Sequence, residues 1–207
     1  MIFGAKIDYS CTYLTYCSIL LYHRKGGIFL NIVEPIRDRA KIEAMKQSLL
    51  RQSRRNYFLF VLGINIGLRI SDIIPLKVRD LQSSHIVIRE SKTGKNVRFL
   101  INNQLRAEIN DYTAGWSPDA YIFPSKKGGY IGRVQAYNIL NTAAQEVGLT
   151  HIGTHTLRKT FGYFHYKRYK DVALLQTLFG HAAPSITLRY IGITQDEIDD
   201  TLADFFL

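Results

Sequence analysis

The chain is organised around the stretch from Leu178 to Tyr190, which reads LFGHAAPSITLRY. It places a histidine, His181, and a tyrosine nine residues apart across a turn. The Gly-His pair ends one helical pattern, and Ser185 to Tyr190 predict one or two further helical turns. The chain has 13 tyrosines, so a tyrosine at position 190 would by itself be a core residue. A function for its hydroxyl requires partners elsewhere in the chain.

The segments upstream predict a mainly helical protein with one small hairpin. Apolar residues at helical spacing, bounded by glycines or capping residues, predict helices near residues 38–52, 57–62, 68–76, 104–112, 134–147, 154–168 and 171–178. Residues 85–90 and 97–101 alternate and are rich in β-branched side chains, and the SKTGK run between them supplies turn chemistry. They predict a β-hairpin with Lys92 at its mouth. Residues 121–123 predict a further short strand, and residues 124–129 a basic loop.

Composition and charge indicate one domain with a polyanionic partner. A chain of 207 residues with 46% hydrophobic content can bury one core, and two full-size domains would not fit. The formal net charge is +10, although the C-terminal segment 193–207 is acidic and has no lysine or arginine. The positive charge is therefore concentrated in the middle of the chain, which favours nucleic acid. A charge that serves only solubility, or an anionic membrane surface, is the alternative.

The N-terminal segment, residues 1–29, lacks a helical or strand pattern. It contains both cysteines, Cys11 and Cys17, which imply no disulfide framework and make a reducing cytoplasm the expected location. Its apolar run over residues 9–22 is shorter than the roughly 20 residues of a membrane-spanning helix, so no membrane partner is expected. Lys25-Gly26-Gly27 can be encoded by a purine run like a ribosome-binding site, ahead of Leu30. We expect residues 1–29 to be a leader outside the native protein.

Several reactive or charged residues look ordinary when they are taken one at a time. His155 and Arg158, three residues apart on a predicted helix, are more often a surface pair than a site. Arg69 can be a buried cation balanced by Asp72, and Lys92 a solvated turn residue. Their combination and order carry more information than any one of them.

Together these residues resemble the tyrosine recombinase (phage integrase) family. The matching pieces are GLRISD around Arg69, SKTG around Lys92, HTLR at residues 155–158, GH at 180–181 and the tyrosine nine residues later. The resemblance covers about residues 34–193. It implies an α+β, mainly helical catalytic domain with a small antiparallel β-hairpin or sheet at one edge. It also implies a site-specific DNA recombinase or integrase that cuts and rejoins double-stranded DNA through a covalent 3′-phosphotyrosine.

The resemblance implies a clamp for the phosphate and an acid for the leaving group. Arg69 and Arg158 are the implied clamp, because guanidinium groups can stabilise charge that grows on the non-bridging phosphate oxygens. Lys92 is the implied general acid, which protonates the departing hydroxyl. The family needs neither a metal ion nor another cofactor, so we expect none here.

The resemblance makes Tyr190 the nucleophile and gives the histidines supporting roles. A phenol with a pKa of about 10 is a poor nucleophile at neutral pH unless a base or a cationic field eases its deprotonation. His155 and His181 are expected to assist proton transfer and to bind the phosphate. Asp72 matches the acidic position beside the first arginine and is expected to orient the site.

Basic residues outside this set are candidates for contacts with the DNA backbone. Each such contact contributes little alone and weakens with salt. The candidates are Arg51, Arg54, Arg55, Lys126, Lys127, Arg133, Lys159 and Lys167.

We expect three segments: the leader at residues 1–29, the catalytic domain at residues 30–193, and a C-terminal helix at residues 194–207. Family members usually carry a helical core-binding domain before the catalytic domain. Here only residues 1–56 precede the buried helix and the first 30 show no such pattern, so tight autonomous DNA binding is not expected. The apolar face of the C-terminal helix can dock in cis or on a neighbouring protomer. Docking in trans implies a homotetramer on two duplexes.

Two other functions fit parts of the same pattern. A catalytically idle DNA-binding regulator would occupy recombination sites without cutting, but it would have no need of Tyr190. A type IB topoisomerase-like enzyme would share the chemistry and relax supercoils as a monomer. Neither the target site nor the direction of the reaction, whether integration, excision, inversion or dimer resolution, follows from the sequence.

Overall fold

The computed structural model describes residues 33–92, 94–193, 197, 203 and 206. Residues 1–32 and 33–207 form separate units, and all described residues belong to the second. The predicted leader lies outside the described residues, as does most of the predicted C-terminal helix. None of the described helices has the length and apolar composition needed to cross a lipid bilayer.

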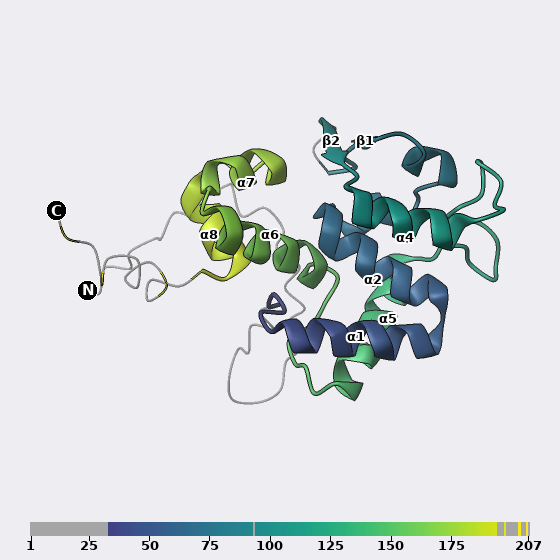
Figure 1. Ribbon diagram of the computed structural model, residues 1–207, viewed down its shortest axis with the longest axis horizontal. Coiled ribbons are helices and arrows are strands. Elements are labelled where there is room, and N and C mark those ends of the chain that lie inside the picture. The colour runs from purple at the N-terminus through teal and green to yellow at the C-terminus, as the bar shows by residue number, and fades with distance from the viewer. Residues whose placement is uncertain (1–32, 93, 194–196, 198–202, 204–205, 207) are drawn as a thin grey trace, which may run out of the picture. The chain divides into compact units, whose positions relative to one another are not determined.

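The described residues fold into eight α-helices, one 3-10 helix and one antiparallel hairpin (Figure 1). In chain order these are α1 (Arg39–Gln52), α2 (Arg54–Ile66), α3 (Ile70–Ile73), the 3-10 helix η1 (Val78–Leu81), β1 (His85–Arg89), β2 (Asn96–Leu100), α4 (Asn103–Thr113), α5 (Arg133–Glu146), α6 (Thr156–Tyr169), α7 (Val172–Phe179) and α8 (Pro184–Ile191). The predicted fold class, mainly helical with a small antiparallel hairpin, is confirmed.

Helix α2 runs through the main hydrophobic core. Ser53 caps its start, because the Ser53 hydroxyl accepts a hydrogen bond from the backbone N–H of Asn56 at 3.2 Å. Gly67 ends it with a left-handed φ of 60°. A Cβ added at Gly63 would lie 2.5 Å from Leu157 Cδ1, so only glycine lets α6 approach this closely. The packing of α2 therefore sets the position of the first turn of α6.

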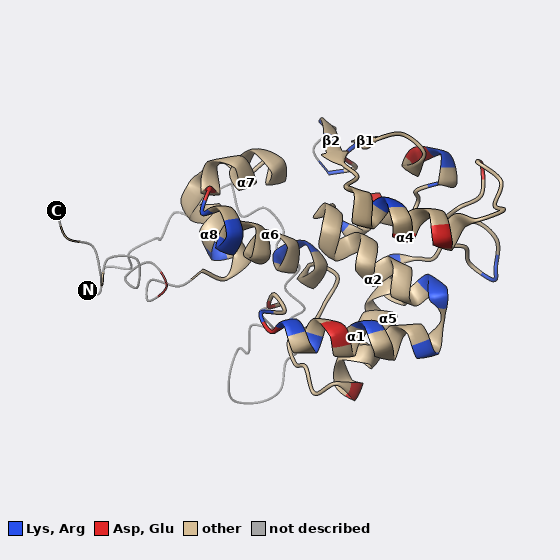
Figure 2. Cartoon of the chain, viewed as in Figure 1, with Lys and Arg blue, Asp and Glu red and all other residues tan. Residues whose placement is uncertain are grey.

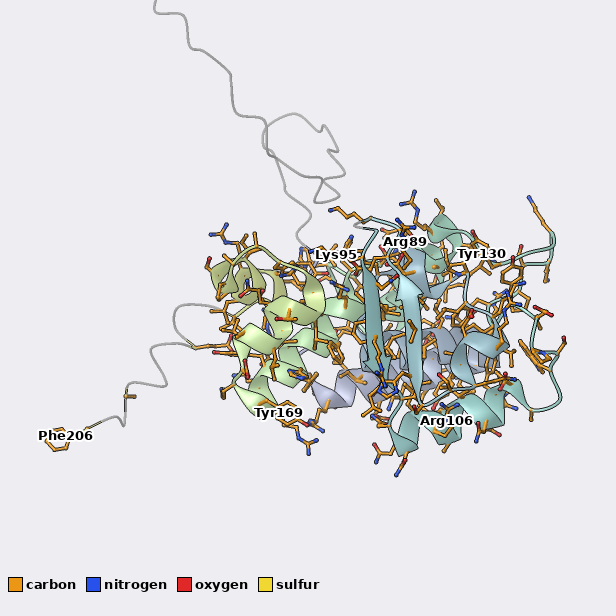
Figure 3. The ribbon with its side chains drawn as sticks, turned by 90° about the horizontal axis from the view of Figure 1, so that it is seen from above. Arg89, Lys95, Arg106, Tyr130, Tyr169 and Phe206 are labelled. Carbon is orange, nitrogen blue, oxygen red and sulfur yellow. The ribbon has the colours of Figure 1, made fainter. Side chains whose placement is uncertain are left out.

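The hairpin pairs residues 85–89 with residues 96–100 in antiparallel register. Its side chains alternate between a buried face, which includes Ile86, and an exposed face, which includes Val87. Figures 1 and 3 both show the hairpin beside the group formed by α6, α7 and α8, and Figure 3 labels Arg89 and Lys95 at its turn. The predicted β-hairpin is therefore confirmed, and Lys92 lies in the turn between its strands.

The predicted strand over residues 121–123 is wrong. This segment makes only isolated bridges, between Tyr121 and Lys77 and between Pro124 and Tyr130. The pairing around Tyr121 does not extend into a ladder, because the Leu76 N–H donates to the Ile73 carbonyl and the Ile122 carbonyl accepts from the Tyr112 hydroxyl.

A second, smaller core holds α6, α7 and α8 together. Its buried residues are Tyr163, Leu175, Phe179, Ile191 and Ile193. A Cβ at position 162 of α6, which is a glycine, would lie 2.6 Å from the Cγ2 atom of Ile191 in α8. This close approach fixes the position of α8. Helix α8 also carries Tyr190, the predicted nucleophile, directly before Ile191.

Candidate active site

Tyr190 lies in the last turn of the short helix α8. Pro184 begins the helix, and Gly192 ends it with a φ of 77°. The half-buried Tyr190 side chain places its Oη 3.3 Å from the Nδ1 atom of His155. The centroid of its ring is 5.1 Å from that of His181. Three predicted site residues therefore lie close together: Tyr190 in α8, His155 directly before α6, and His181 in the turn before α8.

His155 stands immediately before α6, in the N-cap position. The prediction that Thr154 caps this helix is wrong, because α6 begins at Thr156, whose Oγ1 accepts a hydrogen bond from the backbone N–H of Gly153 at 3.1 Å. His155 makes no side-chain cap and its backbone is already helical, with φ −80° and ψ −17°. Its ring lies instead against Tyr190, edge to face at a centroid distance of 6.4 Å.

Burial and neighbouring cations favour the neutral form of both histidines. Burial lowers the pKa of His155, and Arg158 leads the nearby cations that lower it further. The pKa of His181 is lowered to about 4. Burial is the largest cause, and the charge of Arg158 is the next. The Nδ1 atom of His181 lies 3.0 Å from Thr187 Oγ1. At neutral pH the His155 ring is therefore able to accept a proton from the phenol.

Arg158 joins the ends of two helices beneath the tyrosine. Its Nη1 donates to the backbone carbonyl of Gly67 at 2.8 Å, and its Nη2 donates to that of Phe179 at 3.0 Å. The guanidinium also lies 4.3 Å from the centroid of the Phe179 ring. Burial lowers the pKa of Arg158, and Tyr190 is the first of the groups that oppose this effect. The guanidinium and the Tyr190 side chain therefore interact electrostatically.

Arg69 and Arg158 converge on a carboxylate that the sequence analysis missed. Arg69, the N-cap residue of α3, forms an ion pair with Glu90. Arg158 Nη1 lies 4.0 Å from the same Glu90 Oε1 atom. The sequence did contain a signal for Glu90. Glu90 follows Ile86 and Ile88 at alternate positions, so its carboxylate lies on the same, buried face of the strand.

Asp72 holds the turn of the hairpin. Its Oδ1 accepts hydrogen bonds from the backbone N–H of Ser91 at 3.0 Å and from the Ser91 hydroxyl at 2.6 Å. Its Oδ2 is buried without a hydrogen-bond partner among the described residues. Lys92, which follows Ser91 in the chain, is exposed. Its charge contributes to the lowered pKa of His155 and of His181. In the described part of the chain, no group of three or more His, Cys, Asp or Glu residues could hold a metal ion.

The eight basic residues predicted to contact DNA do not gather in one place. Arg54 and Arg55 begin α2, about 18 Å along the helix axis from its other end. Arg54 pairs with Asp111, and Arg55 Nη1 donates to the Pro124 carbonyl at 2.8 Å. Figure 2 shows basic residues where α1 meets α2 and others at the start of α6. The first group, which includes Arg51, is thus remote from the predicted catalytic residues.

The remaining candidates also differ in their surroundings. Lys159 belongs to the site, because its Nζ lies 5.2 Å from the centroid of the Tyr190 ring. Lys167 pairs with Glu197 at 2.7 Å. Three residues lie in or beside the loop before α5, where their side chains are exposed: Lys126, Lys127 and Arg133. Their contact with DNA stays a prediction.

The helical fold is that of a tyrosine recombinase catalytic domain, as comparison with solved structures shows. The crystal structure of XerA recombinase superposes with a TM-score of 0.69 at 18% identity, over 86% of this chain and 68% of that chain. A lambda integrase dimer bound to a COC′ core site gives a TM-score of 0.64 at 17% identity, over 80% of this chain and 62% of that chain.

The chain belongs to the phage integrase family, whose sequence profile matches residues 34–197. A probable integrase/recombinase of Bacillus subtilis, YoeC, is 52% identical over 169 residues, which cover 81% of this chain and 93% of that protein. The predicted family and enzyme class are therefore confirmed. The chain is an integrase/recombinase, a member of a family of enzymes that cleave and rejoin DNA.

Proposed function

We propose that Tyr190 is the nucleophile that cleaves a DNA strand and holds its 3′ end as a phosphotyrosine. The observation that carries this proposal is the distance of 3.3 Å between Tyr190 Oη and His155 Nδ1. A phenol beside a neutral imidazole and a buried guanidinium has both a proton acceptor and a cationic field.

The proposed reaction conserves the energy of the phosphodiester. The phenol gives its proton to His155 Nδ1 while Tyr190 Oη forms a bond to phosphorus. The bond from phosphorus to the 5′-oxygen breaks, and Lys92 donates a proton to that oxygen. A 5′-hydroxyl from another strand then attacks the phosphotyrosine, which reverses the chemistry and rejoins the DNA without a nucleotide cofactor.

Arg69 and Arg158 are the proposed phosphate clamp. They converge on one point, the Glu90 carboxylate, from α3 and α6. Guanidinium groups that meet at a single position can stabilise the charge of a pentacoordinate phosphate in a site largely closed to water. His181, held near Thr187, is proposed to bind the same phosphate, and Asp72 to position the turn that carries Lys92.

We further propose double-stranded DNA as the substrate, a homotetramer as the active assembly and the cytoplasm as its location. The net charge of +10 and the lambda integrase dimer bound to a core site support DNA as the partner. The ion pair between Lys167 and Glu197 supports docking of the beginning of the C-terminal segment on its own α6. Residues beyond it are proposed to reach the neighbouring protomer.

The test is a trapped covalent adduct. Nicked duplexes made from the DNA on either side of the protein's own gene lose a short fragment on cleavage, so religation fails and the adduct accumulates. We expect an adduct with the wild-type chain, a phosphotyrosyl peptide that contains residue 190, and none with Tyr190→Phe. An adduct formed by Tyr190→Phe would exclude this nucleophile. Duplex binding without any adduct would instead favour the idle regulator.

The clamp is better tested at Arg69 than at Arg158. Loss of Arg158 would leave the buried carbonyls of Gly67 and Phe179 without their donor, so Arg158→Ala would disturb the fold as well as the chemistry. Arg69→Lys keeps the charge and loses the planar fork. We expect slower cleavage with duplex affinity retained. A wild-type rate in Arg69→Lys would count against the clamp.

A further inference from the structure

A buried carboxylate sits where the two proposed clamp arginines meet. Glu90 is 3% exposed. Its backbone is fixed in the turn of the hairpin, because its N–H donates to the Lys95 carbonyl and its carbonyl accepts from the Gly94 N–H, both at 2.9 Å. Its Oε1 pairs with Arg69 and lies 4.0 Å from Arg158 Nη1. One oxygen of one anion is thus shared between two guanidinium groups.

The burial of Arg158 shows that a phosphate cannot simply be added to this arrangement. The Arg158 side chain is 2% exposed and that of Arg69 is 16% exposed. A phosphodiester can therefore reach Arg158 only if a covering group moves, and Glu90 is the anionic group between the two arginines. A phosphate beside an unmoved carboxylate would place two anions a few Å apart in a buried site, where like charges repel strongly.

We propose that Glu90 is an internal counter-ion that occupies the anion position of the arginine clamp, and that the DNA phosphate replaces its carboxylate there. The inference rests on the proposed function of Arg69 and Arg158. Without DNA, the carboxylate compensates two buried or half-buried positive charges, which repel each other. With DNA, the phosphate takes over this compensation. Glu90 then opposes binding of any anion that does not bring enough contacts elsewhere.

Replacement of the Glu90 carboxylate by the phosphate would also affect Lys92, the proposed general acid. Side-chain contacts of the described residues tie the turn of the hairpin to the region of α3: Glu90 pairs with Arg69, and the Ser91 hydroxyl donates to Asp72. Lys92 follows directly in the chain. When the phosphate displaces Glu90, the first contact is lost and the second remains. The turn that carries Lys92 then loses its tie through Arg69 and can follow the leaving oxygen.

The test uses Glu90→Gln, which keeps the shape of the side chain and removes its charge. The probe is inorganic sulfate, a tetrahedral anion, added to the full chain as sodium sulfate against sodium chloride at equal ionic strength. We expect Glu90→Gln to unfold at a lower temperature than wild type in chloride. We also expect sulfate to bind it at least tenfold more tightly and to restore most of the lost thermal stability.

Asp119→Asn is the matched control. Asp119 Oδ1 also lies between two cations, 2.6 Å from Arg79 and 3.8 Å from Lys77, but on the surface. The substitution makes the same change in net charge, and we expect a sulfate affinity within twofold of wild type. Equal sulfate affinity in Glu90→Gln and wild type would overturn the proposal, as would an equal gain in Asp119→Asn.

A Glu90→Gln chain that stays unfolded even in high sulfate would also overturn it, because Glu90 would then be a counter-ion that no external anion replaces. None of these measurements involves DNA cleavage. If the sulfate effect holds while the wild-type chain forms no covalent adduct, the nucleophile assignment fails and the anion position stands. If the adduct forms without a sulfate effect, the role of Glu90 fails alone.

Discussion

Substitution of Gly162 by alanine should separate the effect of the position of Tyr190, the proposed nucleophile, from the effect of fold stability. A Cβ at this position in α6 would lie 2.6 Å from Ile191 Cγ2 and 2.8 Å from Phe179 Cε2. Ordinary van der Waals contacts of a Cβ begin at 3.4 Å. Helix α8 must therefore move by roughly 1 Å, and Tyr190 moves with it because it precedes Ile191. A displacement of about 1 Å in a reacting group lowers catalysis on the order of 100-fold.

The effect on stability should be much smaller than the effect on the reaction. Overpacking of a core costs about 1–3 kcal/mol, and replacement of glycine by alanine inside a helix returns about 1 kcal/mol. The expected net loss is about 0–2 kcal/mol, so the protein stays folded. The rate of single-turnover cleavage on a nicked duplex measures the first effect, and urea unfolding measures the second.

Ile109→Val in α4 is the control for stability. It removes one buried methylene from the main core and costs about 1 kcal/mol without a change in the packing of α8. We expect it to cleave at nearly the wild-type rate. Cleavage by Gly162→Ala within threefold of wild type would refute the argument that the contact between α6 and α8 sets the position of Tyr190.

Three further outcomes are expected. Lys159→Ala should slow cleavage about tenfold and leave duplex affinity nearly unchanged, because its ammonium lies over the Tyr190 ring; Lys170→Ala, which removes a similar contact at the other end of α6, is the control in the same assay. The free energy of unfolding, measured in urea at a series of pH values, should fall as the pH drops from about 6.5 to about 4. The folded state keeps His181 neutral, with a pKa of about 4, so below its ordinary pKa the unfolded state binds a proton that the folded state does not. Ser53→Ala should destabilise the chain by about 1 kcal/mol, measured by thermal unfolding, because it removes the cap of α2.

Much of the fold could be predicted because its signals are local. The cap at Ser53, the glycine that ends α2 and the apolar periodicity between them depend on residues a few positions apart. The hairpin was likewise predictable from alternation and a turn sequence. The strand predicted at residues 121–123 is wrong because the backbone groups that a ladder would use have other partners: the Ile122 carbonyl accepts from the Tyr112 hydroxyl, and the Leu76 N–H donates to the Ile73 carbonyl.

The order of the motifs around Arg69, Lys92, His155 and Tyr190 was enough to predict the chemical groups of the site. Which of these groups lie in contact follows from the tertiary structure instead. The carboxylate that pairs with Arg69 comes from Glu90 on the hairpin rather than from Asp72 in the adjacent helix. That pairing joins residues 21 positions apart. Contacts of this kind depend on how the hairpin packs against α3, which no local pattern in the chain encodes.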